Sequence, residues 1–112
     1  MRNKYNAKRQ LYKGIRFDSK KELNRYLILE QMQMKNYISE LEIHPVYPLL
    51  VNGIKIGRYT ADFKYKNKDG EEIIEDVKSK ITRTRDYILR KKILATYTPP
   101  IIITEILWVG LL

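Results

Sequence analysis

The chain has 112 residues, enough for one folded domain with one hydrophobic core, so we expect residues 1–112 to form a single domain. A hydrophobic fraction of 44% argues against disorder, and the lack of cysteine excludes disulfides, cysteine nucleophiles and cysteine-ligated zinc. The N-terminus lacks the apolar stretch of a signal peptide, and the longest apolar run, Ile106 to Leu112, is too short to cross a bilayer. We therefore expect a soluble, cytoplasmic protein without a membrane partner.

The whole chain has a net charge of +9, and its positive charge is concentrated in two blocks. Residues 1–25 hold nine basic and two acidic residues, and residues 78–92 hold seven basic and one acidic residue, whereas the segment between them is slightly acidic. This distribution is typical of a protein that binds a polyanion and uses carboxylates locally. A basic surface that serves only solubility is the alternative.

The N-terminal third predicts an arm, a short hairpin and a helix. Residues 1–10 are polar and basic and indicate a loose arm. The alternation in 11–17 predicts a short strand or part of a hairpin. Ser19 and Glu22 have the spacing of a capping box, in which each side chain accepts a hydrogen bond from the other residue's backbone N–H. The helix that follows is expected to end near Asn36.

Strands and tight turns are predicted for the middle of the chain. Asn52-Gly53 favours a two-residue hairpin turn, and Asn67-Lys68-Asp69-Gly70 favours a type I turn closed by a left-handed glycine. Alternating and β-branched segments around these turns predict strands at residues 41–44, 46–51, 54–56, 59–66 and 71–79.

A second helix is predicted over residues 84–96, ended by Pro99 and Pro100, and a last strand over residues 100–107. The order is then β, α, a β-meander, α, β. It predicts a mixed α/β fold with a central, mostly antiparallel or mixed sheet and two flanking helices.

The turn at Gly70 predicts which side chains meet across the hairpin. If Gly70 closes a three-residue loop, Asp62 stands opposite Asp76, and the two-residue period of a strand puts Lys78 on the same face as Asp76. Two facing carboxylates repel each other unless a cation lies between them. Oxygen ligands in a chain without cysteine favour Mg²⁺, with Mn²⁺ as a substitute, over zinc. Such an ion beside a lysine suits phosphodiester hydrolysis by an activated water.

These residues resemble the PD-(D/E)xK nuclease superfamily, which includes restriction enzymes, transposon-end nucleases, phage endonuclease I and archaeal-type junction resolvases. The pattern consists of Asp62, then Asp76-Val77-Lys78, with Glu22 upstream on a helix. The chain is most similar to small phage and prophage proteins of this superfamily. The matching stretches are Tyr5-Asn6-Ala7-Lys8, Gly14-Ile15-Arg16-Phe17-Asp18-Ser19-Lys20-Lys21-Glu22, Tyr59-Thr60-Ala61-Asp62-Phe63 and Glu75-Asp76-Val77-Lys78. The chain departs from the pattern at Ala61, where the superfamily name has proline, and at Ser79, where glycine is frequent.

The resemblance implies a restriction-endonuclease-like core and a Mg²⁺-dependent endodeoxyribonuclease. The catalytic residues would be Glu22, Asp62, Asp76 and Lys78. Asp62, Asp76 and the Val77 carbonyl would bind the metal, and Glu22 would approach it directly or through water. Lys78 would serve the water nucleophile. No small-molecule cofactor is implied, and a phage-encoded protein would act in the bacterial host cell.

Each of these residues also has a structural interpretation. The capping box explains Glu22 without catalysis, and Asp76 with Lys78 could form an ion pair on a solvated strand. Glu75 points to the opposite face and is the alternative ligand if a bulge shifts the register. His44 lies outside the motif and is expected to be structural.

DNA is the expected partner, bound collectively by basic side chains that flank the motif residues. They are Lys20, Lys21, Arg25, Lys80, Arg83, Arg85, Arg90, Lys91 and Lys92. The chain has no base-reading helix, so recognition of DNA shape, such as a branch or a Holliday junction, is favoured over a long sequence. Symmetric cutting of two strands predicts a homodimer. The apolar residues 107–112 are either its contact or a last strand over the core. The alternative function is a catalytically silent DNA-binding or accessory protein of the same fold.

Overall fold

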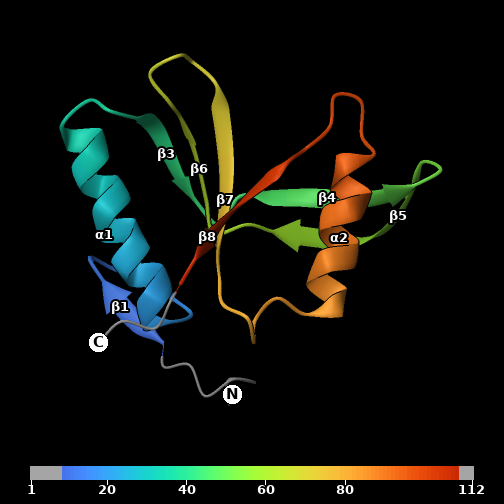
Figure 1. The fold of residues 1–112 in the computed structure, drawn as a ribbon, viewed down its shortest axis with the longest axis horizontal. Coiled ribbons are helices and arrows are strands. Elements are labelled where there is room, and N and C mark those ends of the chain that lie inside the picture. The colour runs from blue at the N-terminus through green and yellow to red at the C-terminus, as the bar shows by residue number, and fades with distance from the viewer. Residues whose placement is uncertain (1–8, 109–112) are drawn as a thin grey trace.

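Residues 9–108 are described by a computed structural model, shown as a ribbon in Figure 1. Its elements in chain order are β1 (Gln10–Tyr12), β2 (Ile15–Phe17), α1 (Lys20–Met34), β3 (Ser39–Ile43), β4 (Val46–Val51), β5 (Ile54–Thr60), β6 (Phe63–Lys66), β7 (Glu72–Lys78), α2 (Arg85–Ala95) and β8 (Ile103–Leu107). Nearly all of the expected basic arm and most of the apolar segment 107–112 lie outside the described residues. Between residues 9 and 108, no helix has the length and hydrophobicity needed to span a membrane.

The central sheet has four strands in the order β3-β6-β7-β8. β3, β6 and β7 pair antiparallel, and β8 pairs parallel with β7, so the predicted mixed α/β fold with a mixed sheet is confirmed. Val77 packs in the same cluster as Tyr26 and Leu29 of α1, whereas Ile74 packs with Tyr87 and Leu94 of α2. Ile74 and Val77 point to opposite faces of β7. The two helices therefore cover opposite faces of the sheet (Figure 1).

The predicted tight turns are confirmed. Asn52 and Gly53 have φ values of 51° and 79°, as a two-residue hairpin turn requires, and they join β4 to β5. Gly70 has φ 80° and its N–H donates to the Asn67 carbonyl at 3.0 Å, which closes the β6–β7 turn. Phe63 pairs with Glu75, in the register that the turn predicted, and this is the last pair of the two strands on the side of Asp62.

The prediction of a single strand over residues 59–66 is wrong. The strand β5 ends at Thr60 and pairs with β4 in a separate two-stranded ribbon, whereas β6 begins at Phe63 in the central sheet. Tyr59 and Ala61 consequently pack in the α2 cluster, but Phe63 and Tyr65 pack in the α1 cluster. All four side chains are buried, so their alternation continues through the break and gives no sign of it.

Candidate active site

The break between β5 and β6 is a corner at which two chain segments change sheets together. Asp62 lies at this corner, next to His44 and Pro45, which connect β3 to β4. The Asp62 carbonyl accepts a hydrogen bond from His44 N–H (3.0 Å), and the Pro45 carbonyl accepts one from Ala61 N–H (3.0 Å). These two bonds fix the backbone of Asp62, so its side chain extends from a rigid segment of the chain.

Asp62 and Asp76 are joined by reciprocal hydrogen bonds between their strands. Asp62 N–H donates to Asp76 Oδ1 at 2.8 Å, and Val77 N–H donates to Asp62 Oδ2 at 2.8 Å. Within residues 9–108, no hydrogen bond reaches the other oxygen of either carboxylate. Each carboxylate is thus oriented through one oxygen, and its second oxygen has no hydrogen bond among the described residues.

The two carboxylates hold their protons more strongly than ordinary aspartates do. Burial raises the pKa of Asp76, which is 2% exposed, to about 6. Burial, followed by the nearby charge of Glu22, raises the pKa of Asp62 to about 7. A positive charge from Lys78 opposes both shifts. Ionising both carboxylates together is therefore unfavourable unless a positive charge lies close to them.

Lys78 is half-buried and lies next to the aspartates on the α2 side of β7. Its ammonium nitrogen lies 4.2 Å from the ring centroid of Tyr87, in the first turn of α2, where the ring face attracts a cation. The Tyr87 hydroxyl donates to Glu105 Oε2 at 2.8 Å, which fixes the ring. Lys78 is thus held by packing, and no salt bridge joins it to an acidic residue within the described chain.

Glu22 reaches the same corner from the N-terminus of α1 and is 4% exposed. The predicted capping box is half formed. Glu22 N–H donates to Ser19 Oγ at 3.3 Å, but the Glu22 carboxylate accepts from Asp18 N–H at 3.3 Å and not from Ser19. The charge of Glu22 contributes to the raised pKa values of Asp62 and Asp76. Glu22 is therefore both part of the helix cap and part of the carboxylate cluster.

His44 belongs to this group, although the sequence predicted only a structural role. Its Nε2 lies 2.6 Å from Glu22 Oε1, and this hydrogen bond raises the pKa of His44. A lone histidine before a proline gives no signal of such a contact. Only the pairing of the two sheet-changing segments, 43–46 and 60–63, brings His44 to Glu22.

Comparison with known proteins yields one family. The sequence model of a family described as "Protein of unknown function (DUF1064)" matches residues 2–107. The chain belongs to the DUF1064 family. Neither the curated proteins nor the solved structures contain a match to this DUF1064 chain.

Several of the basic residues expected to contact DNA pair with acidic side chains in this DUF1064 chain. Arg25 binds Glu75 through two hydrogen bonds of 2.7 and 3.0 Å. Arg83 and Lys91 both lie within salt-bridge distance of Glu105, and Arg90 pairs with Asp86. Those that are exposed and make no salt bridge between residues 9 and 108 are Lys20, Lys80, Arg85 and Lys92.

Lys21 differs from the other basic residues because it turns into the site. Its ammonium lies 3.4 Å from Ser79 Oγ and 3.3 Å from Thr82 Oγ1, in the loop after β7. Burial, followed by repulsion from Lys78, lowers the pKa of Lys21. The corner of this DUF1064 chain thus holds two lysines beside its carboxylates.

The donor atoms fit Mg²⁺ or Mn²⁺ when only two carboxylates bind directly. In the part of the chain that the structure describes, no three His, Cys, Asp or Glu side chains are gathered as a ready metal site. Mg²⁺ in proteins commonly takes one or two carboxylates and keeps several waters. Asp62 and Asp76 would supply these oxygens, and Glu22, already bonded to His44 and Asp18, would act through a water.

Proposed function

We propose that this protein is a metal-dependent DNA endonuclease that hydrolyses phosphodiester bonds with Asp62, Asp76, Lys78 and Glu22. The observation that carries the proposal is the pair of half-buried Asp62 and buried Asp76, in which each carboxylate is oriented by a backbone N–H and keeps one oxygen for a ligand. A purely structural ion pair does not explain the geometry, because Lys78 rests on Tyr87 and forms no salt bridge with Asp76 among the described residues.

Each residue has a distinct task in this proposal. Asp62 and Asp76 would hold Mg²⁺ or Mn²⁺, with the Val77 carbonyl as a further ligand, and the ion would supply polarisation of the scissile phosphate and activation of a water. Glu22 would accept a hydrogen bond from a water in the site. Lys78 orients the attacking water and offsets the negative charge that develops on the phosphate.

The order of elements supports the proposed restriction-endonuclease-like core. The helix α1 carries Glu22, the start of β6 follows Asp62, and β7 ends with Asp76-Val77-Lys78. DNA would follow the exposed Lys20, Lys80, Arg85 and Lys92 and be read by shape, for example at a branch or junction. Such an enzyme would act in the cytoplasm, of a bacterial host if a phage encodes it.

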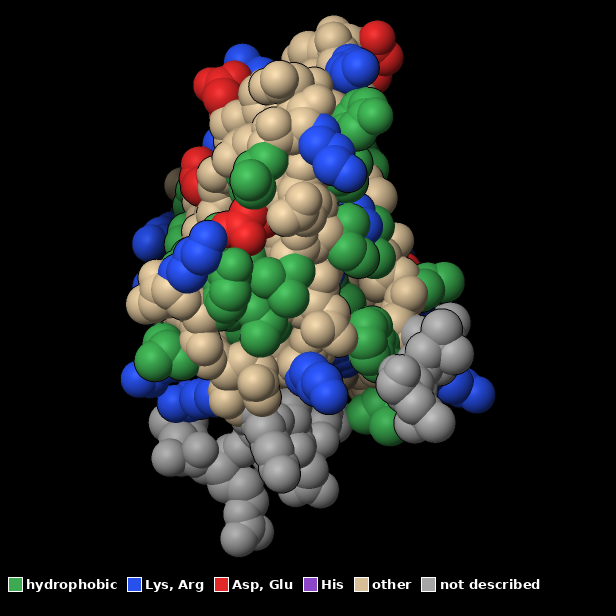
Figure 2. Space-filling view, turned by 90° about the vertical axis from the view of Figure 1, so that its left-hand side faces the viewer, with side chains coloured by type: hydrophobic (Ala, Val, Ile, Leu, Met, Phe, Trp, Pro, Cys, Tyr) green, Lys and Arg blue, Asp and Glu red, His purple; other side chains and the backbone are tan. Residues whose placement is uncertain are grey.

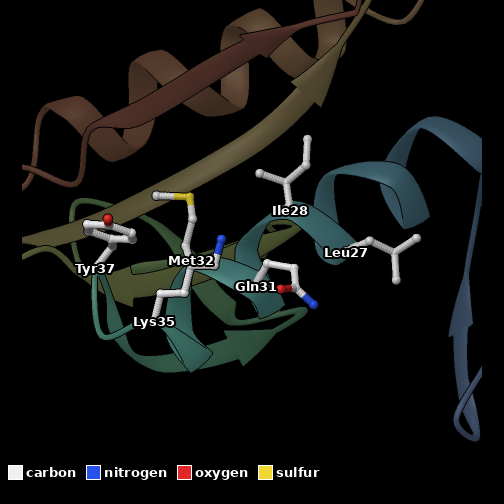
Figure 3. Close-up of a pocket in the computed structure, with 6 residues that line it drawn as sticks. All are labelled: Leu27, Ile28, Gln31, Met32, Lys35 and Tyr37. Atoms are coloured by element: carbon white, nitrogen blue, oxygen red, sulfur yellow. The ribbon is translucent and has the colours of Figure 1, made fainter.

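We further propose that the protein works as a homodimer through the outer face of α1, because cutting both strands requires two sites. This face forms a shallow groove of about 370 Å³ lined by Leu27, Ile28, Gln31, Met32, Lys35 and Tyr37 (Figure 3), of which Lys35 is the one charged side chain. Ile28 is 51% exposed. Figure 2 shows the side of the molecule that carries α1, where hydrophobic side chains reach the surface between basic ones. A weakly charged face allows two copies of a chain with net charge +9 to approach.

Cleavage assays on DNA of defined shape test the proposed function. The purified full chain is incubated with plasmid, flapped and four-way-junction DNA in Mg²⁺, in Mn²⁺ and in EDTA. We expect metal-dependent cleavage, strongest on branched DNA, and a loss of at least about 100-fold in Asp62→Asn and Asp76→Asn, because each removes a metal ligand. Lys55→Ala, on β5, exposed and not among the residues proposed to contact DNA, is the control for protein quality.

Two outcomes would contradict the proposal. One is an Asp76→Asn variant that cuts as well as the parent. The other is salt-sensitive DNA binding without any metal-dependent product, which is the result expected of a catalytically silent DNA-binding or accessory protein.

A further inference from the structure

We propose that His44 is a positioning residue that holds the Glu22 carboxylate in place beside Asp62. The inference rests on the proposed metal-dependent function and adds a residue that the sequence motif does not contain. Its basis is the hydrogen bond between His44 Nε2 and Glu22 Oε1, which at 2.6 Å is the shortest between side chains at this corner.

The Glu22 carboxylate is held through both of its oxygens. Oε2 accepts from Asp18 N–H at 3.3 Å, at the start of α1, and Oε1 accepts from His44. A glutamate side chain has three rotatable bonds, and the single long bond to Asp18 leaves the carboxylate free to turn. The second bond, to His44, fixes the plane of the carboxylate.

His44 can impose this orientation because its own backbone is fixed to the metal-binding corner. His44 N–H donates to the Asp62 carbonyl at 3.0 Å, and the next residue, Pro45, accepts from Ala61 N–H. His44 has φ 56°, a left-handed conformation that directs the chain from β3 into β4. Its ring also lies 6.3 Å from that of Phe17, just before α1.

One imidazole thus connects the helix that carries Glu22 to the loop that carries Asp62. Hydrogen bonds that orient metal-site carboxylates typically contribute 10- to 100-fold to metal affinity. Because Glu22 would act through a water and not as a direct ligand, we expect a contribution near the lower end of that range.

The experiment measures Mn²⁺ binding to the full-length protein without DNA, by calorimetry and by the paramagnetic resonance signal of free Mn²⁺. His44→Gln keeps an N–H donor at about the reach of Nε2, whereas His44→Asn has a shorter side chain that cannot reach Glu22. We expect His44→Asn to weaken Mn²⁺ binding about tenfold and His44→Gln to restore most of that loss. The exposed Leu89→Ala variant on α2 controls for nonspecific effects.

A double-mutant comparison tests whether His44 acts through Glu22. Glu22→Gln should weaken Mn²⁺ binding about as much as His44→Asn does, and the double variant should lose little more than either alone. The proposal is overturned if the losses simply add, if His44→Asn binds Mn²⁺ like the parent, or if His44→Gln is as weak as His44→Asn.

The outcomes for His44 and for the proposed function are distinct. A parent protein that binds Mn²⁺ with the expected His44 pattern but cuts no DNA overturns the nuclease proposal and supports the role of His44. A parent that cuts DNA while His44→Asn retains full Mn²⁺ affinity overturns the role of His44 alone. A parent that binds no Mn²⁺ overturns both.

Discussion

At the scale of single residues, the Asp62–Asp76 pair suits ligand binding and opposes folding. Burial raises the pKa of Asp76 to about 6 and that of Asp62 to about 7, so the folded chain retains protons that the unfolded chain has released. Folding therefore takes up protons between about pH 4 and about pH 7, and the free energy of unfolding falls as the pH rises through this window. A bound divalent cation would reverse this loss, because it stabilises the charged carboxylates.

Asp76→Asn should therefore stabilise the metal-free protein at neutral pH. The amide has no charge to bury and its Oδ1 still accepts the hydrogen bond from Asp62 N–H. From the pKa of about 6, we expect a gain of about 2–3 kcal/mol at pH 7.5 that disappears near pH 4. Urea denaturation in EDTA at a series of pH values measures the difference between variant and parent. If variant and parent are equally stable at pH 7.5, burial of the Asp76 carboxylate does not cost the protein stability, and the prediction is wrong.

At the scale of elements, an ion pair between α1 and β7 joins the helix of Glu22 to the strand of Asp76. The Arg25 guanidinium forms two hydrogen bonds with Glu75, whose side chain is 0% exposed and also accepts from the Tyr65 hydroxyl at 2.7 Å. The pair explains Glu75, which the sequence left as an alternative metal ligand. It also engages Arg25, which the sequence assigned to DNA contacts.

Arg25→Ala should destabilise the protein by about 3–5 kcal/mol, because it leaves the Glu75 carboxylate buried without its partner. Chemical denaturation measures the loss. Lys20→Ala, on the same helix but exposed and without a salt bridge among the described residues, should change stability by less than about 0.5 kcal/mol. If Arg25→Ala instead weakens DNA binding at unchanged stability, the original DNA-contact assignment of Arg25 is right.

Local signals predicted most elements, and contacts between distant segments account for what was missed. Gly70 requires a left-handed turn, so the β6–β7 register could be derived from the sequence, and Ser19 marked the start of α1. The break at Ala61-Asp62 has no local signal, because both sides of the corner bury alternate residues. The contact of His44 with Glu22 and that of Arg25 with Glu75 join residues 22 and 50 positions apart, beyond the reach of any local pattern.

At the scale of the whole molecule, fewer basic residues are available to a partner than the 22 lysines and arginines of the sequence suggest. Glu105 alone neutralises parts of the second basic block, because it pairs with Arg83 and Lys91 and also accepts from Tyr87. Burial alone would raise the pKa of Glu105, but these hydrogen bonds keep that pKa below its ordinary value. The exposed basic residues without a salt bridge among the described residues lie at the start of α1, in the loop after β7 and on α2, and they are the ones that would attract DNA in the proposed function.

The outer face of α1 is the place where self-association can be tested without touching that corner. Ile28→Lys puts one positive charge from each copy into the proposed dimer contact, and we expect the dimer dissociation constant to rise about tenfold or more, since the charges are desolvated and unpaired. Leu89→Lys, on α2 and 58% exposed, adds the same charge elsewhere and should leave the dimer intact. Sedimentation velocity over a range of concentrations measures both. Because a single site cuts one strand at a time, we also expect Ile28→Lys to nick plasmid DNA under conditions in which the parent linearises it. A parent protein that stays monomeric at every concentration would contradict the proposed dimer.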